Sequence, residues 1–570
     1  MTTGKSSLVN FVLFFLLVAT PYSIVVKNHG LLFDSAHLPV LAGLAAIALT
    51  LTAVAAITGA VTVTALLSGC CLVLLVDFVT GFFDTLVFPE GAEAASGAGI
   101  LIFVAFAATV LAGTWIFRKT LQTFMIAALG AVLVSTVAMA ALDQFTGSSP
   151  VQRKTMQASA KKLPVYIHII LDEQQGISGF NDNTAGHKAI KTDLGEFFQR
   201  NSFKVFTRAY SQYFRTVEAV PAMLNFASVD QVGPLIQQAP QSEFGKLGTI
   251  RFTTSKNPYF DHLLQQGYRL HVYQTNWLGY CKAYAGAIAK CSTHTYTINR
   301  AALARLKFMD RARLLLRLHV SQSLLTKALL KALQSPADWS GLLGPQISFP
   351  AFDELMRDVS VAKGGDMFFA HLFMPHYPYS VDSTCSLRRP LVTSWLEISN
   401  HTGHSEPLLF NSPESRRERY DLYIPQVRCA MAKLETLFDV LKKRGLYDDA
   451  IIVVNGDHGS RIVINKPLMD NKDVLKPQDF YDGFSALFAV KMPGVAATRD
   501  QTMITLSHLL KMTAAGPDGL NHSLVEDGNP QVYLHRKETE AVRGKMTAFP
   551  MPPLPKSALP KPALPMPALP

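Results

Sequence analysis

The chain has 570 residues, a length that predicts two or three parts rather than one ordinary domain. Its net charge is +11, but the lysines and arginines are scattered and do not form basic stripes interleaved with aromatic residues, which argues against a nucleic-acid partner. Hydrophobic residues make up 49% of the chain, a high share for a soluble protein, and their excess lies in the first 142 residues.

The N-terminal part has the pattern of a membrane domain. Each of its apolar runs has roughly the 20 residues that a helix needs to cross a bilayer. The runs cover 8–27, 37–58, 60–80, 98–117 and 121–142. We therefore predict a multi-span α-helical membrane bundle of about five helices over residues 1–142. The bundle is either an anchor alone or also presents a lipid substrate to the part that follows.

Loop charges predict the orientation of this bundle. Lys5 precedes the first run, and Arg118 and Lys119 lie between the fourth and fifth runs, whereas the loop between the third and fourth is acidic. Basic loops prefer the cytoplasmic side. The N-terminus should therefore be inside, and everything after residue 142 outside. This arrangement predicts a multi-pass protein of the inner (cytoplasmic) membrane with its catalytic domain on the extracytoplasmic, periplasmic face.

A polar, basic stretch at 143–163 predicts a linker, after which the pattern of the chain changes. Short, β-branched apolar runs that are typical of buried strands occur at 165–171, 367–373 and 450–456. Between them, 419–444 is amphipathic and predicts a helix. Strands that alternate with helices predict an α/β domain over 164–525, with a largely parallel central sheet flanked by helices.

The C-terminal stretch 526–570 is rich in proline and ends in repeated Ala-Leu-Pro units. Proline lacks the backbone N–H that helices and strand ladders use, so this stretch is predicted to be an extended or disordered tail. Four cysteines lie in the globular part, an even number that an oxidising compartment would allow to pair. We predict disulfides joining Cys281 to Cys291 and Cys385 to Cys429.

Polar residues follow the three strand-like runs. Asp172 and Glu173 end the first, His376 lies just beyond the second, and Asp457 and His458 end the third. Ligand sites in such sheets form at the carboxyl ends of strands, so these residues should share one site. Carboxylate oxygens with an imidazole nitrogen suit zinc or manganese. One acidic pair alone is more often structural, but two such pairs favour a site for one or two divalent ions.

A nucleophile would have to lie beside such an ion. Thr216 is a candidate because it begins a predicted helix, where free N–H groups favour an anion. A metal ion would lower the pKa of its hydroxyl and shield the charge of a phosphate ester. Taken alone, Thr216 is also a good helix N-cap. Glu218, two residues later, either orients a ligand or lies on the surface of the helix.

Four motifs, in this order, resemble the alkaline-phosphatase/sulfatase superfamily. They are Leu171-Asp172-Glu173, Thr216-x4-Pro221-Ala222-Met223-Leu224, His371-x4-His376-x-Pro378 and Gly456-Asp457-His458-Gly459. With its membrane part in front, the chain looks like the membrane-anchored phosphoethanolamine transferases and lipoteichoic acid synthases of that superfamily. The resemblance covers the predicted catalytic domain, 164–525.

The resemblance implies roles for the motif residues. Those that would hold the principal divalent metal are Glu173, Thr216, Asp457 and His458. Asp172 would lie near the metal or be a ligand itself. Thr216 would also attack phosphorus and carry a covalent phospho-group. His376, together with His371, would bind phosphoryl oxygens or protonate a leaving group.

The implied reaction is the transfer of a phosphoethanolamine- or phosphoglycerol-type headgroup from a membrane phospholipid to a glycan or lipid acceptor of the cell envelope. Arg215, Lys363 and Asn276 are candidate headgroup contacts, or ordinary surface and packing residues. Sulfatases need a Cys or Ser in a Cys-x-Pro-x-Arg context, and Thr216 occupies that place, so sulfate-ester hydrolysis is disfavoured. Two alternatives stay open: a hydrolase or phosphodiesterase that uses water, and a non-catalytic membrane scaffold.

Overall fold

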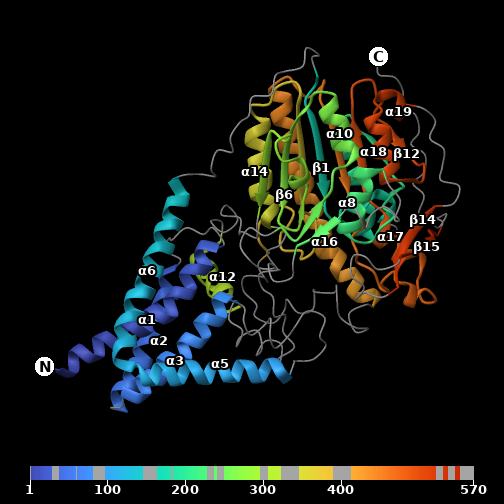
Figure 1. The fold of residues 1–570 in the computed structure, drawn as a ribbon. Coiled ribbons are helices and arrows are strands. Elements are labelled where there is room, and N and C mark those ends of the chain that lie inside the picture. Colours follow the sequence, from blue (N-terminus) through green and yellow to red (C-terminus); the bar gives the residue numbers. More distant parts are fainter. Residues whose placement is uncertain are drawn as a thin grey trace. The chain divides into compact units, whose positions relative to one another are not determined.

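The computed structural model describes residues 2–28, 37–58, 61–80, 97–145, 163–180, 184–226, 236–239, 250–294, 306–321, 346–388, 412–521, 530–536 and 546–552. Contacts divide the chain into two compact units (Figure 1). The N-terminal unit comprises Met1–Pro150, Tyr296–Leu343 and Ser386–Thr402. The globular unit comprises Val151–Thr295, Gly344–Cys385 and Gly403–Pro570.

Helices of the N-terminal unit coincide with the predicted apolar runs. They are α1 (Thr2–Asn28), α2 (Leu38–Ile57), α3 (Val61–Thr80), α5 (Gly97–Ile116) and α6 (Arg118–Phe145). Leu13 of α1, Ala48 of α2 and Met125 of α6 share one apolar cluster. A buried hydroxyl pair, Ser23 and Thr136, joins α1 to α6 at 2.9 Å. These five helices therefore lie where the sequence has its apolar runs.

Length and composition single out two of these helices as able to cross a membrane, over Ser7–Ile24 and Leu38–Ile57. In the described parts of the other helices the apolar stretches are shorter, at Val63–Val73, Val104–Ile116 and Thr123–Ala138. Two apolar N-terminal helices are consistent with a membrane-anchored protein. The five-span bundle stays a prediction.

One helix of this unit was not predicted. Helix α12 (Phe308–Ser321) lies far along the chain, within the stretch that the sequence assigns to the catalytic domain. Its Leu314 and Leu315 pack in one apolar cluster with Ala19 of α1 and Val40 of α2. The helix therefore belongs to the N-terminal unit.

An eight-stranded sheet forms the centre of the globular unit (Figure 1). In spatial order its strands are β12 (Arg499–Asp500), β2 (Lys204–Phe206), β11 (Phe488–Lys491), β10 (Ile451–Gly456), β1 (Tyr166–Leu171), β9 (Asp366–Leu372), β6 (Arg269–Thr275) and β8 (Lys290–His294). Neighbouring strands are parallel except β11, which is antiparallel to both β10 and β2. The predicted α/β domain is therefore present, and its sheet is mixed.

Helices cover both faces of this sheet. The first face carries α7 (Ala185–Arg200), α14 (Ser348–Val359) and α16 (Pro413–Lys443), and the second carries α8 (Thr216–Asn225), α10 (Pro258–Gln265) and α18 (Leu506–Ala514). In β1, Ile167 and Ile169 pack toward the first face, and Tyr166 and Ile170 toward the second. Burial on both faces explains why this strand is apolar without alternation.

Smaller elements complete the globular unit. The short strands are β3 (Ala209–Tyr210), β4 (Ile236–Gln238), β5 (Phe252–Thr254), β7 (Leu278–Gly279), β13 (Ile504–Thr505), β14 (Gln531–His535) and β15 (Met546–Pro550). The short helices are η2 (Ile177–Gly179), η5 (Lys282–Tyr284), η8 (Met469–Asn471), α17 (Pro477–Phe484) and α19 (Pro517–Asn521).

The prediction of a disordered tail over 526–570 is wrong at the residues of this stretch that the structure describes, 530–536 and 546–552. Strands β14 and β15 pair antiparallel, and we call them the C-terminal hairpin. Val532 and Leu534 are fully buried against Phe480 and Phe484 of α17. Pro550 is tolerated because β15 is an edge strand of a two-stranded sheet, where proline can occur without breaking a central ladder. Residues 553–570 lie outside the described residues.

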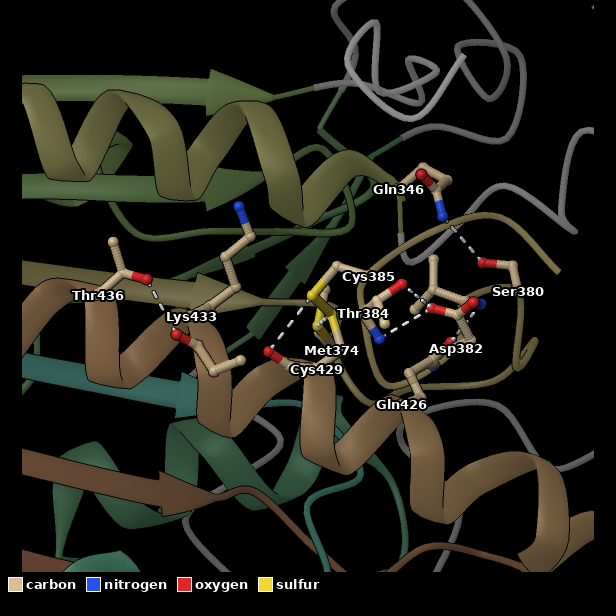
Figure 2. Close-up of a disulfide and its surroundings, with 12 residues drawn as sticks. Gln346, Met374, Ser380, Asp382, Thr384, Cys385, Gln426, Cys429, Lys433 and Thr436 are labelled. Carbon is tan, nitrogen blue, oxygen red and sulfur yellow. Dashed lines mark hydrogen bonds between the residues drawn. A yellow bond between two sulfur atoms is a disulfide. The ribbon is translucent and has the colours of Figure 1, made fainter. Parts of the chain in front are cut away.

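Both predicted disulfides are confirmed. Cys281 is bonded to Cys291, which joins the loop after β7 to β8. Cys385 is bonded to Cys429, which joins the segment after β9 to helix α16 (Figure 2).

Candidate active site

Three adjacent strands end at the candidate site. Leu171, the last residue of β1, is paired in register with Gly456 on one side and Leu372 on the other. Because these pairings are parallel, the residues that follow the strands leave the sheet at one edge. The Asp172 N–H donates to the Leu372 carbonyl at 2.9 Å, and Asp457 follows Gly456 directly.

Asp172, Asp457 and His458 form a buried cluster in which one ligand atom of each lies within 4.8 Å of the others. Nδ1 of His458 lies 3.0 Å from the Gly459 carbonyl, which can only accept, so we assign the proton to Nδ1. The lone pair of Nε2 then faces Oδ2 of Asp457 at 3.1 Å. Two acceptors this close call for a cation between them.

Thr216 joins the same cluster. It is the first residue of α8, and Arg215 occupies the N-cap position. The Thr216 hydroxyl is therefore not the helix cap: Oγ1 lies 3.2 Å from Nε2 of His458 and 3.4 Å from Oδ1 of Asp172. The sequence motifs thus converge in space, with the hydroxyl of one beside the carboxylates and imidazole of the others.

The electrostatics of the cluster fit a divalent cation. Burial raises the pKa of Asp457, and the neighbouring charge of Asp172 raises it further. Oδ2 of Asp457 makes no hydrogen bond among the described residues. Two buried carboxylates repel each other unless a positive charge lies between them. A divalent ion would hold both ionised, and the mixed oxygen and nitrogen donors suit zinc or manganese.

Glu173 lies outside this cluster, contrary to the ligand role that the resemblance implies for it. Its backbone is left-handed, with φ of 62°. The Tyr423 hydroxyl of α16 holds this turn by donating to the Glu173 carbonyl at 2.7 Å and accepting from the Gln175 N–H at 2.9 Å. The turn directs the carboxylate toward the segment after β9, while Asp172 lies in the cluster.

The Glu173 carboxylate instead organises the outer side of the site. It accepts a hydrogen bond from the Tyr377 N–H at 2.9 Å, and it lies 3.5 Å from both Nε2 of His376 and Nε of Arg461. Burial alone would lower the pKa of His376, but the Glu173 and Asp172 carboxylates outweigh it and raise the pKa. His376 and Arg461 keep 24% and 21% of their side chains exposed, so they mark the accessible side.

His371 has a different environment from His376. It lies within β9 and is fully buried, on the sheet face that α8 covers. Nε2 lies 3.4 Å from Oδ2 of Asp172, and Nδ1 lies 2.8 Å from the Tyr280 hydroxyl. The two predicted histidines therefore approach the site separately, His371 from inside the sheet and His376 from the accessible side.

Helix α16 fixes the segment that carries His376. Nε2 of Gln426 donates to the carbonyls of Pro375 and His376 at 2.9 and 2.8 Å, and Oε1 of Gln426 accepts from the Val381 N–H at 3.2 Å. The Cys385–Cys429 disulfide ties the far end of the segment to the same helix. His376 is thus held on rigid structure although it lies in a loop.

Glycine is required in the Asp-His-Gly motif by close backbone contact. A Cβ on Gly459 would lie 2.3 Å from the Asp482 carbonyl oxygen. Asp482 is itself held by a buried ion pair in which Arg416 donates from Nε at 2.6 Å and from Nη2 at 2.8 Å. The loop that carries His458 therefore rests directly on the end of α17.

Other predicted site residues behave differently from expectation. Glu218 is not a surface residue: it is fully buried, 3.0 Å from Nη2 of Arg215 and 3.3 Å from Nε2 of His535. Arg215 is thereby engaged with the C-terminal hairpin. Lys363 is exposed at the amino end of β9, the wrong end for a headgroup contact. Asn276, which follows β6, stays a prediction.

Sequence reasoning missed three residues that contribute to the site. Arg461 follows His458 in the same loop, so its proximity in sequence was an available signal. Tyr280 belongs to no motif. Its neighbour Cys281 has a predicted disulfide, which indicates only that this loop is held in place. His535 lies in the stretch that proline content assigned to a tail, which concealed it.

The comparisons with known proteins agree with this geometry. No family model matches the chain. Over 143 residues the chain is 29% identical to the lipoteichoic acid synthase of Staphylococcus saprophyticus, which covers 23% of this chain and 22% of that protein. This relative is one of the lipoteichoic acid synthases that the sequence motifs resemble. The chain spans less than a quarter of the length of this curated relative.

Solved structures resemble the chain more distantly. The C-terminal periplasmic domain of EptC from Escherichia coli, in complex with zinc, aligns at a TM-score of 0.39 and 12% identity, over 70% of this chain and 95% of that one. The phosphonate monoester hydrolase of Agrobacterium radiobacter aligns at 0.38 and 11%, over 67% and 82%. The resemblance to the superfamily therefore rests on the motifs, their convergence and the curated relative.

Proposed function

We propose that the chain transfers a phosphoethanolamine- or phosphoglycerol-type headgroup from a membrane phospholipid to a hydroxyl of an envelope glycan or lipid. The observation that carries this proposal is the Thr216 hydroxyl, 3.2 Å from Nε2 of His458 and 3.4 Å from Oδ1 of Asp172. A hydroxyl in that place is both a ligand and a nucleophile. Threonine cannot become formylglycine, which supports phosphoryl over sulfuryl chemistry.

The residues that would hold a divalent ion are Asp172, Asp457, His458 and Thr216. Zinc or manganese, as one or two ions, fits these donors. Bound there, the ion would lower the pKa of the Thr216 hydroxyl and shield the charge of the phosphate. Thr216 then reacts as an alkoxide whose proton has already passed to solvent.

The first step forms a phosphothreonine. Oγ1 of Thr216 bonds to phosphorus while the bond between phosphorus and the diacylglycerol oxygen breaks. His376, on the accessible side of the site, gives its proton to that leaving oxygen. Arg461 and the Nε2–H of His371 donate hydrogen bonds to the phosphoryl oxygens, where negative charge grows as the reaction proceeds.

The second step releases the headgroup to the acceptor. The acceptor hydroxyl attacks phosphorus and gives its proton to His376, and the bond between phosphorus and Oγ1 of Thr216 breaks. This returns the alkoxide and the protonated histidine, so the proton balance closes over the two steps. With water as acceptor, the same steps describe the hydrolase alternative.

The membrane part of the proposal follows from the donor. A multi-pass anchor with the N-terminus inside would keep the globular unit on the extracytoplasmic side, where the lipid headgroups of the outer leaflet are in reach. Two disulfides in the globular unit support this side, because such bonds persist in oxidising compartments.

Labelled lipid tests the proposal. Purified full-length chain, loaded with zinc, is incubated with phosphatidylethanolamine or phosphatidylglycerol labelled in the headgroup, and Thr216 is examined by mass spectrometry. We expect a headgroup adduct on wild type and on Thr216→Ser, and none on Thr216→Ala. Thr207→Ala is the matched control, since that buried hydroxyl donates to the Asp500 carbonyl instead.

The fate of the label separates the candidate functions. Label on a second glycan or lipid molecule supports transfer, whereas quantitative release as free phosphate ester identifies a hydrolase. An unmodified Thr216 with every donor, in a chain that holds zinc, would overturn the enzymatic proposal in favour of a scaffold.

A further inference from the structure

His371 is held by a residue outside every sequence motif. Tyr280, which follows β7, brings its hydroxyl to 2.8 Å from Nδ1 of His371, and both side chains are fully buried. The other ring nitrogen, Nε2, makes no hydrogen bond among the described residues and lies 3.4 Å from Oδ2 of Asp172. One nitrogen is thus anchored, and the other faces the reacting centre.

The two neighbours of the ring decide where its proton lies. The Asp172 carboxylate only accepts, so it attracts a proton on Nε2 and would repel a lone pair there. The Tyr280 hydroxyl then donates to the unprotonated Nδ1. Burial raises the pKa of Tyr280, with a further contribution from the charges of Asp457 and Asp172, so the hydroxyl keeps the proton that it donates.

We propose that Tyr280 is a positioning residue that selects the His371 tautomer whose Nε2–H donates to a phosphoryl oxygen. This inference rests on the phosphoryl chemistry proposed above and deepens it, because Tyr280 itself contacts neither substrate nor cation. Without the hydroxyl, Nδ1 would lose its donor and only Asp172 would favour Nε2–H, so the tautomer with the proton on Nδ1 would be populated more often.

Surrounding structure holds Tyr280 in place. Its N–H donates to Oε1 of Gln274, at the end of β6, at 2.7 Å. Its ring packs edge-on against Phe369 of β9 at 5.0 Å between centroids. The next residue, Cys281, is bonded to Cys291 of β8. Gln274 of β6, the ring of Phe369 and the Cys281–Cys291 disulfide therefore fix the position of the Tyr280 hydroxyl. A hydrogen bond of defined geometry needs such support.

Phosphate binding tests the proposal by a double-mutant cycle. The full-length, zinc-loaded chain is titrated calorimetrically with inorganic phosphate in four forms: wild type, Tyr280→Phe, His371→Asn and the double variant. Asn keeps a polar group near the position of Nδ1 but has nothing at Nε2. We expect Tyr280→Phe to weaken phosphate binding about three- to tenfold when His371 is present. In the His371→Asn background it should have no further effect.

Tyr259→Phe is the matched control. The Tyr259 hydroxyl lies 3.0 Å from Nδ1 of another fully buried histidine, His168, on the same face of the sheet but away from the cation cluster. It should lose stability much as Tyr280→Phe does and keep its phosphate affinity. Thermal unfolding of all variants separates loss of fold from loss of binding.

Three results would overturn the inference: unchanged phosphate affinity in Tyr280→Phe, an equal loss with and without His371, or a wild-type chain that binds no phosphate. Phosphate binding does not require headgroup transfer. A chain that shows the coupling but moves no headgroup therefore contradicts the proposed transfer and leaves the role of Tyr280 intact.

Discussion

Leu171 of β1 and Gly456 of β10 are the last paired residues of two parallel strands. Their register places Asp172 and Asp457 side by side where the chain leaves the sheet. A shift of one residue in this pairing would turn one carboxylate to the opposite face, because side chains alternate along a strand. The register of the central strands is therefore as important to the site as the identity of its residues.

Metal content should distinguish Asp172 from Glu173. Asp172 lies in the cation cluster and Glu173 does not, so Asp172→Asn should weaken zinc binding at least about 100-fold, and Glu173→Gln less than about tenfold. The two substitutions are isosteric and remove one charge each, so they control for one another. Elemental analysis after equilibration against a zinc buffer measures the difference. The opposite ranking would restore Glu173 as the ligand.

Truncation should show that the C-terminal hairpin is part of the fold. A chain that stops after residue 529 loses Val532 and Leu534 from their buried cluster, and we expect a lower unfolding temperature and loss of activity. A chain that stops after residue 552 keeps the hairpin and should match wild type.

A point variant tests the same hairpin with less disruption. Leu534→Ala should cost about 2–5 kcal/mol in the free energy of unfolding, because it removes a fully buried side chain. Differential scanning fluorimetry in detergent compares this variant with both truncations. Equal stability of all forms would show that the hairpin is dispensable.

The two disulfides should differ in what their removal changes. Chain entropy predicts a loss of roughly 4 kcal/mol for Cys385→Ser/Cys429→Ser and roughly 2.7 kcal/mol for Cys281→Ser/Cys291→Ser, because the bonds close loops of 44 and 10 residues. Removal of the Cys281–Cys291 disulfide should nevertheless weaken phosphate binding more than removal of Cys385–Cys429, since Cys281 adjoins Tyr280. Urea unfolding measures the loss of stability, and phosphate titration measures the loss of affinity. If the same double variant showed the larger loss in both measurements, the expectation would be contradicted.

Acid should destabilise the globular unit partly through Glu354 of α14. Burial would raise the pKa of this carboxyl, but hydrogen bonds from His294, Lys290 and Ser292 outweigh burial and lower it from 4.5 to about 2. The stabilisation is complete above the unfolded pKa and is lost as the pH falls toward 2. The unfolding temperature of wild type should therefore drop more steeply below pH about 4.5 than that of Glu354→Gln. Parallel curves would exclude this contribution.

The sequence was sufficient for those parts of the site that depend on local pattern. Apolar runs that end in polar pairs identified the strand ends, and parallel topology then brought Asp172, Asp457 and His458 together. Thr216 was placed beside them by its position at a helix start and by the family resemblance. The sequence could not show which of Asp172 and Glu173 joins the cation cluster, because the turn at Glu173 is held by Tyr423, 250 positions away. No local pattern marks a contact at that separation.

Tyr280 and the C-terminal hairpin were not predicted for other physical reasons. Tyr280 reaches His371 through tertiary packing, so its hydroxyl looks like that of any other core tyrosine in the sequence. The C-terminal hairpin was hidden because proline content dominates the composition after residue 540, whereas a few buried side chains, such as Val532 and Leu534, decide the structure.

The order of the site residues along the chain has a consequence for its assembly. Asp172 is made 285 residues before Asp457 (457 − 172), and the hairpin that contacts Arg215 is made later still. A chain that folds as it is synthesised, from the N-terminus, would hold an incomplete centre for most of that time. Capture of the ion would thus be one of the last events of biogenesis, and a product that terminates before residue 457 would lack the cation cluster.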